Sequence, residues 1–203
     1  SSKTSQHLIF YTQPCNNSTI DTVGWYTDFE RAGVPFVSNQ KYNYTQILYN
    51  ASELNGAKNI SSISLHYAYT TNLVKTNCTI YMANTTLQEF DEHRTIVPFS
   101  EMTPVFAGDL TFTRGWNEIP LQNTFFYNGT DNLVIAIDDN SGTYSRNGDK
   151  FYMHNTPNYS ACAYYGTDDN PDPEQDSIIG SFSRQSMRPN IKLTGCPVDE
   201  THI

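Results

Sequence analysis

Apolar residues in this chain recur in short segments with a period of two, and this pattern constrains the fold more than any other feature. In the clearest segment, Ile63, Leu65 and Tyr67 alternate with Ser64 and His66. A β-strand presents successive side chains to opposite faces, so the pattern predicts a strand with one buried face and places His66 on the exposed one.

Further segments of the chain have the same strand character, and Asn-Gly and Ser-Gly pairs typical of turns separate several of them. We expect strands at 60–69, 78–83, 105–112, 116–121, 133–137, 151–154, 161–165, 178–182 and 191–193. The segment 133–137 is apolar at every position, which favours a strand covered on both faces. Many short strands without a helical period predict an all-β jelly-roll or galactose-binding-like β-sandwich of two antiparallel sheets.

With 203 residues, the chain is long enough for one large β-domain. We expect this domain to span 39–195. The weakly patterned residues 1–38 form a lead-in segment that could supply an edge strand. Residues 196–203 resemble the start of a linker, so we expect the domain to be part of a larger multidomain chain.

The charge balance argues against two classes of partner. The formal net charge is −9, with only 12 Lys and Arg residues, and these are scattered. Phosphate-rich partners need clustered cations, so we expect no nucleic acid and no electrostatic attachment to anionic membranes. No apolar segment approaches the roughly 20 residues of a membrane helix, so we also expect no membrane insertion.

The four cysteines, Cys15, Cys78, Cys162 and Cys196, allow three pairings and contain no CxxC motif. An even number fits disulfides in an oxidising compartment, and four buried thiols are the alternative. We expect a disulfide between Cys15 and Cys196, because both lie outside the apparent core strands and would join the two ends.

Several segments together carry a family resemblance. The strongest are GWNEIPL at 115–121 and FYNGTDNLVIAIDDNSG at 126–142, and others lie at 42–49, 60–65, 80–86, 105–108 and 188–191. In these segments the chain resembles jelly-roll modules of large secreted surface proteins of anaerobic bacteria, related to gingipain and hemagglutinin (cleaved-adhesin-like) domains. The resemblance implies a secreted or cell-surface binding or adhesion module that recognises a glycan or a host surface protein and often holds calcium. A passive spacer in a long surface protein and a glycoside hydrolase are the alternatives.

No catalytic motif with specific spacing is present in the chain. The sequence lacks GxSxG, HExxH, a GxxxxGK[ST] phosphate loop and GxGxxG. Asp138 and Asp139 are adjacent on a strand, so their side chains point to opposite faces and are poorly placed to flank one glycosidic bond. We therefore expect the chain not to be an enzyme.

Aromatic and amide side chains in the polar loops form the candidate ligand site: Tyr144, Tyr159, Tyr164, Tyr165 and Asn147. Sugar C–H groups pack on aromatic rings, and amide side chains satisfy hydroxyl groups. We interpret these residues as a glycan platform at one end of the sandwich. The alternative is that most of the tyrosines are half-buried strand residues, above all Tyr164 and Tyr165.

An acidic stretch at 168–176 is the candidate calcium site, with Asp168, Asp169 and Asp172 as ligands. Calcium prefers several carboxylate and carbonyl oxygens from an irregular loop. The stretch does not follow EF-hand spacing, and a solvated acidic loop is the alternative.

Overall fold

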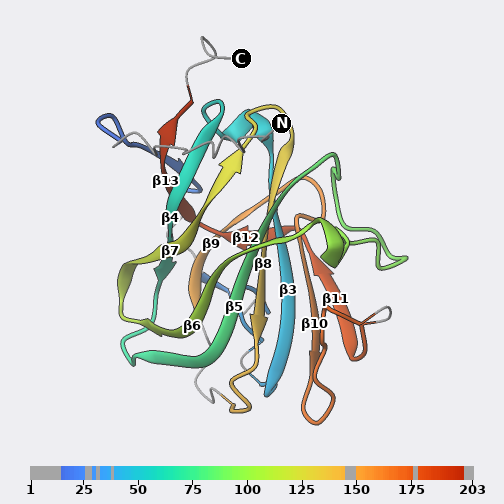
Figure 1. Ribbon diagram of the computed structural model, residues 1–203. Helices are drawn as coiled ribbons and strands as arrows, with labels where there is room; N and C mark the ends of the chain where they lie inside the picture. Colours follow the sequence, from blue (N-terminus) through green and yellow to red (C-terminus); the bar gives the residue numbers. More distant parts are fainter. Residues whose placement is uncertain are drawn as a thin grey trace, which may run out of the picture.

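The computed structural model describes residues 15–25, 29–30, 33–37, 39–144, 150–175 and 178–198, with the backbone alone for 29–30. These residues form a sandwich of two antiparallel β-sheets (Figure 1). The predicted all-β fold class is confirmed.

The six-stranded sheet is called sheet B, and most of its strands lie side by side in the centre and right of Figure 1. Its strand order is β11 (Ser181–Gln185), β10 (Ala161–Gly166), β3 (Tyr42–Tyr49), β8 (Asn132–Asp139), β5 (Leu73–Thr85) and β6 (Thr103–Phe112). Strand β8 therefore lies between β3 and β5, and each pair is antiparallel.

The seven-stranded sheet, called sheet A, packs against sheet B, and its strands β13, β4 and β7 lie at the left of Figure 1. Its main path is β1 (Thr19–Val23), β13 (Ile191–Pro197), β4 (Lys58–Tyr67), β9 (Phe151–Asn155) and β12 (Met187–Pro189). In addition, β7 (Gly115–Tyr127) pairs with β4, and β2 (Phe29–Glu30) pairs with β9. The expected lead-in segment thus contributes β1 at the sheet edge, and β13 continues two residues past the expected domain end at 195.

Most of the expected strands are present, but β3 has no clear period in the sequence. Seven of its eight residues are buried, so both faces of the strand are covered and the sequence does not alternate between apolar and polar residues. Its polar side chains are paired instead: Gln46 accepts from the Val97 backbone N–H at 2.9 Å and donates to the Val97 carbonyl at 2.8 Å. Strand β11 begins three residues later than the expected segment 178–182.

Two hydrophobic clusters explain why the segment 133–137 of β8 is apolar at every position. Ile135 and Ile137 face the main core between the sheets, and Val134 and Ala136 face a second cluster on the outer side of sheet B. The second cluster is covered by the segment between β5 and β6, which contributes the fully buried Phe90. The expectation that this strand is covered on both faces is confirmed.

The structure joins Cys15 and Cys196 in a disulfide with their Cα atoms 5.8 Å apart, which confirms the expected pairing. Cys78 and Cys162 are buried free thiols. The part of the chain that the structure describes has two short 3-10 helices, η1 (Ala51–Glu53) and η2 (Phe99–Glu101), and no helix long and apolar enough to cross a membrane.

Candidate ligand-binding face of sheet A

Three aromatic rings form a row on the outer face of sheet A, with His66 in the middle. The His66 imidazole stacks on Trp116 with ring centroids 4.5 Å apart and an interplanar angle of 13°. On its other side, the Tyr152 ring lies 4.3 Å away at 45°. The pairing of β4 with β7 places His66 directly opposite Trp116, so the stack follows from strand register.

Lys192 of β13 completes the row. Its ammonium lies 4.4 Å from the centroid of the Trp116 ring, a cation–π geometry. Partial burial, together with the positive charge of Lys192, lowers the pKa of His66 below its ordinary value. His66 is therefore neutral at pH 7, and Lys192 supplies the positive charge of the row.

A groove of about 560 Å³ lies between the end of β1, Glu53 and the end of β9. It is lined by Thr22, Val23, Gly24, Trp25, Glu53, His154 and Asn155. The Trp25 side chain is 83% exposed, the most exposed large hydrophobic residue of the described chain. An exposed indole beside polar groups is a common feature of binding sites.

Gly24 lets the chain pass close to the wall of the groove. Its φ is +89°, and a Cβ at this position would lie 2.1 Å from Oδ1 of Asn190 and 2.4 Å from Nδ1 of His154. Only glycine accommodates both the backbone angle and the close approach. The sequence at this position therefore determines where the next residue, Trp25, reaches the surface.

Arg188 is fully buried and holds two residues that line the groove, Glu53 and His154. Its guanidinium bonds the Glu53 carboxylate and the Leu48 carbonyl, and its Nε donates to Nε2 of His154 at 3.0 Å. It also lies 4.7 Å over the Tyr49 ring. A buried charge with this many partners fixes the side chains that line the groove.

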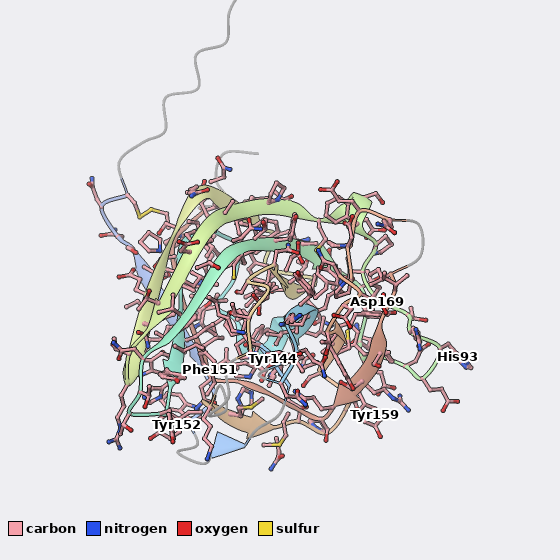
Figure 2. All side chains as sticks on the ribbon, turned by 90° about the horizontal axis from the view of Figure 1, so that it is seen from below. His93, Tyr144, Phe151, Tyr152, Tyr159 and Asp169 are labelled. Carbon is pink, nitrogen blue, oxygen red and sulfur yellow. A yellow bond between two sulfur atoms is a disulfide. The ribbon has the colours of Figure 1, made fainter. Side chains whose placement is uncertain are left out.

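The groove and the aromatic row belong to one surface. Thr22 lines the groove and pairs directly with Lys192 across β1 and β13. On β9, Tyr152 and His154 are two residues apart and so share a face. Figure 2 shows the adjacent residues Phe151 and Tyr152 pointing to opposite sides, and Phe151 is fully buried. The sheet A face is defined here as Thr22, Trp25, His66, Trp116, Tyr152, His154 and Lys192.

The expected glycan platform is not assembled as a single site. Tyr144 follows the end of β8, where Asp139 pairs with Asn43 at one end of β3. Tyr159 precedes β10, whose first residue Ala161 pairs near the other end of β3. The two exposed tyrosines therefore lie at opposite ends of sheet B. The loop after β8 begins at the start of β3, whereas the loop before β10 ends near the last residues of β3.

The other predicted ligand residues are also dispersed. Tyr164 is buried in the second cluster against Phe182, with ring centroids 4.9 Å apart, and Tyr165 packs against the main core. This placement agrees with the alternative that both are strand residues. Asn147 lies outside the described residues.

The predicted calcium ligands lie on an exposed loop. Asp168 is 3.8 Å from the Lys41 ammonium, and Asp169 is exposed at the surface (Figure 2). Asp172 accepts hydrogen bonds from the backbone N–H of Glu174 and from the Gln175 amide. Among the described residues, no three His, Cys, Asp or Glu side chains are grouped to hold a metal ion, and calcium stays a prediction.

Sequence reasoning missed most of the sheet A face. It placed His66 on an exposed strand face, and Trp116 also lies at an outward position of a predicted strand. These positions indicated outward-facing rings, but the sequence did not show that the two strands pair and bring the rings together. Trp25 and His154 had no such signal, because the groove depends on contacts between segments far apart in the sequence.

Comparison with known proteins yields one distant structural likeness. No family model and no curated protein matches the chain. A solved chain with the cysteine protease and lectin-like domains of Cwp84, a surface-layer-associated protein of Clostridium difficile, is similar with 11% identity and a TM-score of 0.44. The match covers 78% of this chain and 33% of that one, so this chain spans about a third of its length. Nothing in these comparisons bears specifically on gingipain or hemagglutinin domains, and that resemblance stays a prediction.

Proposed function

We propose that this chain is a non-catalytic extracellular binding module that recognises a glycan through the sheet A face. The observation that carries the proposal is the row of Tyr152, His66 and Trp116, held in contact at the surface of a rigid sheet. The rings are already ordered by the strands, so binding would cost little side-chain entropy.

The chemistry of the face suits a sugar better than a purely apolar ligand. Sugar rings carry C–H groups that pack on aromatic faces, and their hydroxyls need hydrogen-bond partners. Trp25 supplies a second exposed ring, and Thr22 and Asn155 supply polar groups beside it. The face therefore combines flat apolar contacts with polar edges.

The disulfide supports the proposed setting outside the cell. Bonded cysteines persist in oxidising compartments and are rare where thiols are kept reduced. The Cys15–Cys196 link joins the segment before β1 to β13, the strand that pairs with β1 at the edge of sheet A. We infer that the module is secreted or displayed at a cell surface.

A glycan array with the purified chain, two site variants and one control variant tests the proposal. We expect specific binding by the parent protein and at least about tenfold weaker binding after Trp116→Ala or Trp25→Ala, as expected for an aromatic anchor. Tyr159→Ala is the matched control: it removes an exposed ring away from the sheet A face and should leave binding unchanged.

Each other result has a definite meaning. Binding lost in Tyr159→Ala and retained in Trp116→Ala would contradict the sheet A face as the site. Silence across the array with normal folding would favour the spacer alternative. Cleavage of a bound glycan would contradict the non-catalytic part of the proposal.

A further inference from the structure

Three polar side chains lie fully buried at one end of the core between the sheets. Asp139 of β8 is 0% exposed, Asn43 of β3 is 0% exposed and Lys75 of β5 is 1% exposed. The Lys75 ammonium lies 3.0 Å from Oδ2 of Asp139, and the Asn43 amide nitrogen donates to the same oxygen at 2.8 Å. One carboxylate oxygen therefore contacts both an amine and a carboxamide.

The backbone is shaped to bring this group together. Asn43 and Cys78 are both paired directly with Asp139, from the two strands that flank β8. An irregularity in β5 between Lys75 and Cys78, where Asn77 has a φ of +53°, turns both Lys75 and Cys78 into the core. Without that extra length, alternation would put one of them outside.

The second carboxylate oxygen is held separately. Oδ1 of Asp139 accepts from the backbone N–H of Ser141 at 3.0 Å and from the Ser141 hydroxyl, and the Cys78 thiol lies 3.8 Å away. The carboxylate is thus fixed in orientation, and Oδ2 is left to the amine and the amide. Such fixed placement of reacting groups is what a slow intramolecular reaction requires.

We propose that Lys75 and Asn43 are the partners of an intramolecular isopeptide bond, with Asp139 as the catalytic proton-transfer residue. Lys75 Nζ gives a proton to Asp139 and attacks Cγ of Asn43. A new N–C bond forms and the bond from Cγ to Nδ2 breaks. Of the two protons that Lys75 loses, one is taken up by the departing nitrogen, which leaves as ammonia, and the other stays on Asp139. The product is a secondary amide between the two side chains, and neither oxidant nor reductant is needed.

The surroundings favour both parts of this reaction. Ion pairs buried from water are costly, so transfer of the proton from ammonium to carboxylate is eased and leaves a neutral amine, the nucleophilic form. The buried Phe36 ring lies 5.4 Å from Lys75 Nζ and covers the amine on one side. Oδ1 of Asn43 has no hydrogen-bond partner among the described residues, so the amide oxygen is open to a donor such as protonated Asp139.

The bond would connect β3 to β5 across β8, three neighbouring strands of sheet B. A covalent cross-link of this kind reduces the conformational entropy of the unfolded chain, and it survives reduction of the Cys15–Cys196 disulfide. It would suit a module exposed to proteases outside the cell, but it requires no ligand. The inference is thus independent of glycan binding.

Intact-mass measurement of the reduced chain tests the proposal directly. We expect a mass about 17 Da below that calculated from the sequence, the loss of one ammonia. Proteolysis followed by tandem mass spectrometry should yield one branched peptide that joins the segments containing Lys75 and Asn43. Lys75→Arg, which keeps the charge but removes the primary amine, should restore the calculated mass.

Two further variants keep the test decisive. Asp139→Ala should also restore the calculated mass, while Lys192→Arg, a lysine outside the core, should retain the loss. A parent protein with the calculated mass would overturn the proposal, whatever the variants do. A loss of about 18 Da, with a branched peptide joining Lys75 to Asp139, would also overturn it, because that product is formed by loss of water.

Discussion

Arg188 donates from Nε to Nε2 of His154 across 3.0 Å, and this direction fixes the protonation of the imidazole. Arginine has only donors, so Nε2 must be the acceptor and the proton lies on Nδ1. Nδ1 faces Oδ1 of Asn190 at 2.9 Å, an acceptor that fits this tautomer. His154 is therefore neutral in the folded protein. Protonation of Nε2 at low pH would remove the acceptor for Arg188, so the hydrogen bonds of the groove wall depend on pH.

The stability of the fold should fall as the pH drops below about 6.5. Burial, with the Arg188 charge as a smaller cause, lowers the pKa of His154 from its ordinary value of 6.5. As the pH falls, His154 binds a proton in the unfolded chain before it does so in the folded protein. The stabilisation is therefore complete above pH 6.5 and is lost as the pH falls from 6.5 toward the lower pKa of the folded state. Urea unfolding from pH 7.5 to 5 should show a smaller decline for His154→Gln than for the parent. His93→Gln, at an exposed site, should leave the parental decline unchanged.

Arg188→Met should lower the free energy of unfolding by about 3–5 kcal/mol, because it leaves the Leu48 carbonyl and the Glu53 carboxylate without their buried donor. Arg114→Met, at an exposed turn, should change stability by no more than about 0.5 kcal/mol. Denaturant unfolding at pH 7.5 measures both variants. Equal effects at the two positions would contradict the role assigned to the Arg188 network.

Asp138→Asn should stabilise the protein at high pH and not at low pH. Burial, with added repulsion from Asp172 and other acidic groups, raises the pKa of Asp138 to about 7, although a hydrogen bond from Asn140 opposes the shift. The folded protein holds this proton more tightly than the unfolded chain, so the parent loses stability as the pH rises from about 3.8 to about 7. The variant has no such loss.

The gain in unfolding free energy from Asp138→Asn should thus grow through that pH window to a few kcal/mol at pH 8. Paired urea titrations at pH 4 and pH 8 measure this growth. Asp169→Asn, at an exposed position of the acidic loop, serves as the comparison and should show no comparable trend. A gain that does not vary with pH would show that ionisation of Asp138 is not its cause.

The predicted calcium site can be tested by thermal unfolding with added calcium and with EDTA. If the acidic loop binds calcium, the ion should raise Tm as its concentration exceeds Kd, because it binds only the folded state. Asp172→Asn should then reduce the shift. An identical Tm in calcium and in EDTA would refute the calcium prediction and favour the solvated loop.

Sequence alternation was sufficient for strands that have one polar and one apolar face. Strand β4 was predicted closely because its buried Ile63 and Leu65 alternate with outward residues. Strand β3 was not, because it is buried on both sides and the polar Gln46 is hydrogen-bonded to a distant segment of the chain. The Cys15–Cys196 pairing was also predicted, since the two residues lie near the ends of the chain.

The candidate site was predicted much less well, for a reason of geometry. Tyr144 and Tyr159 both lie in polar loops, but strand direction puts these loops at opposite ends of sheet B. Conversely, His66 and Trp116 are 50 positions apart in the sequence, and only the pairing of β4 with β7 makes them neighbours.

The sequence by itself determined the secondary-structure class, the main strand positions and the exposed orientation of His66, because these follow from local alternation. Only the tertiary structure decided which outward rings stack, that Trp25 and His154 line one groove, and that Lys75 and Asn43 contact one buried carboxylate oxygen of Asp139. These arrangements depend on strand order and register. Strand pairing joins residues that are distant in sequence, and no local pattern specifies the partner.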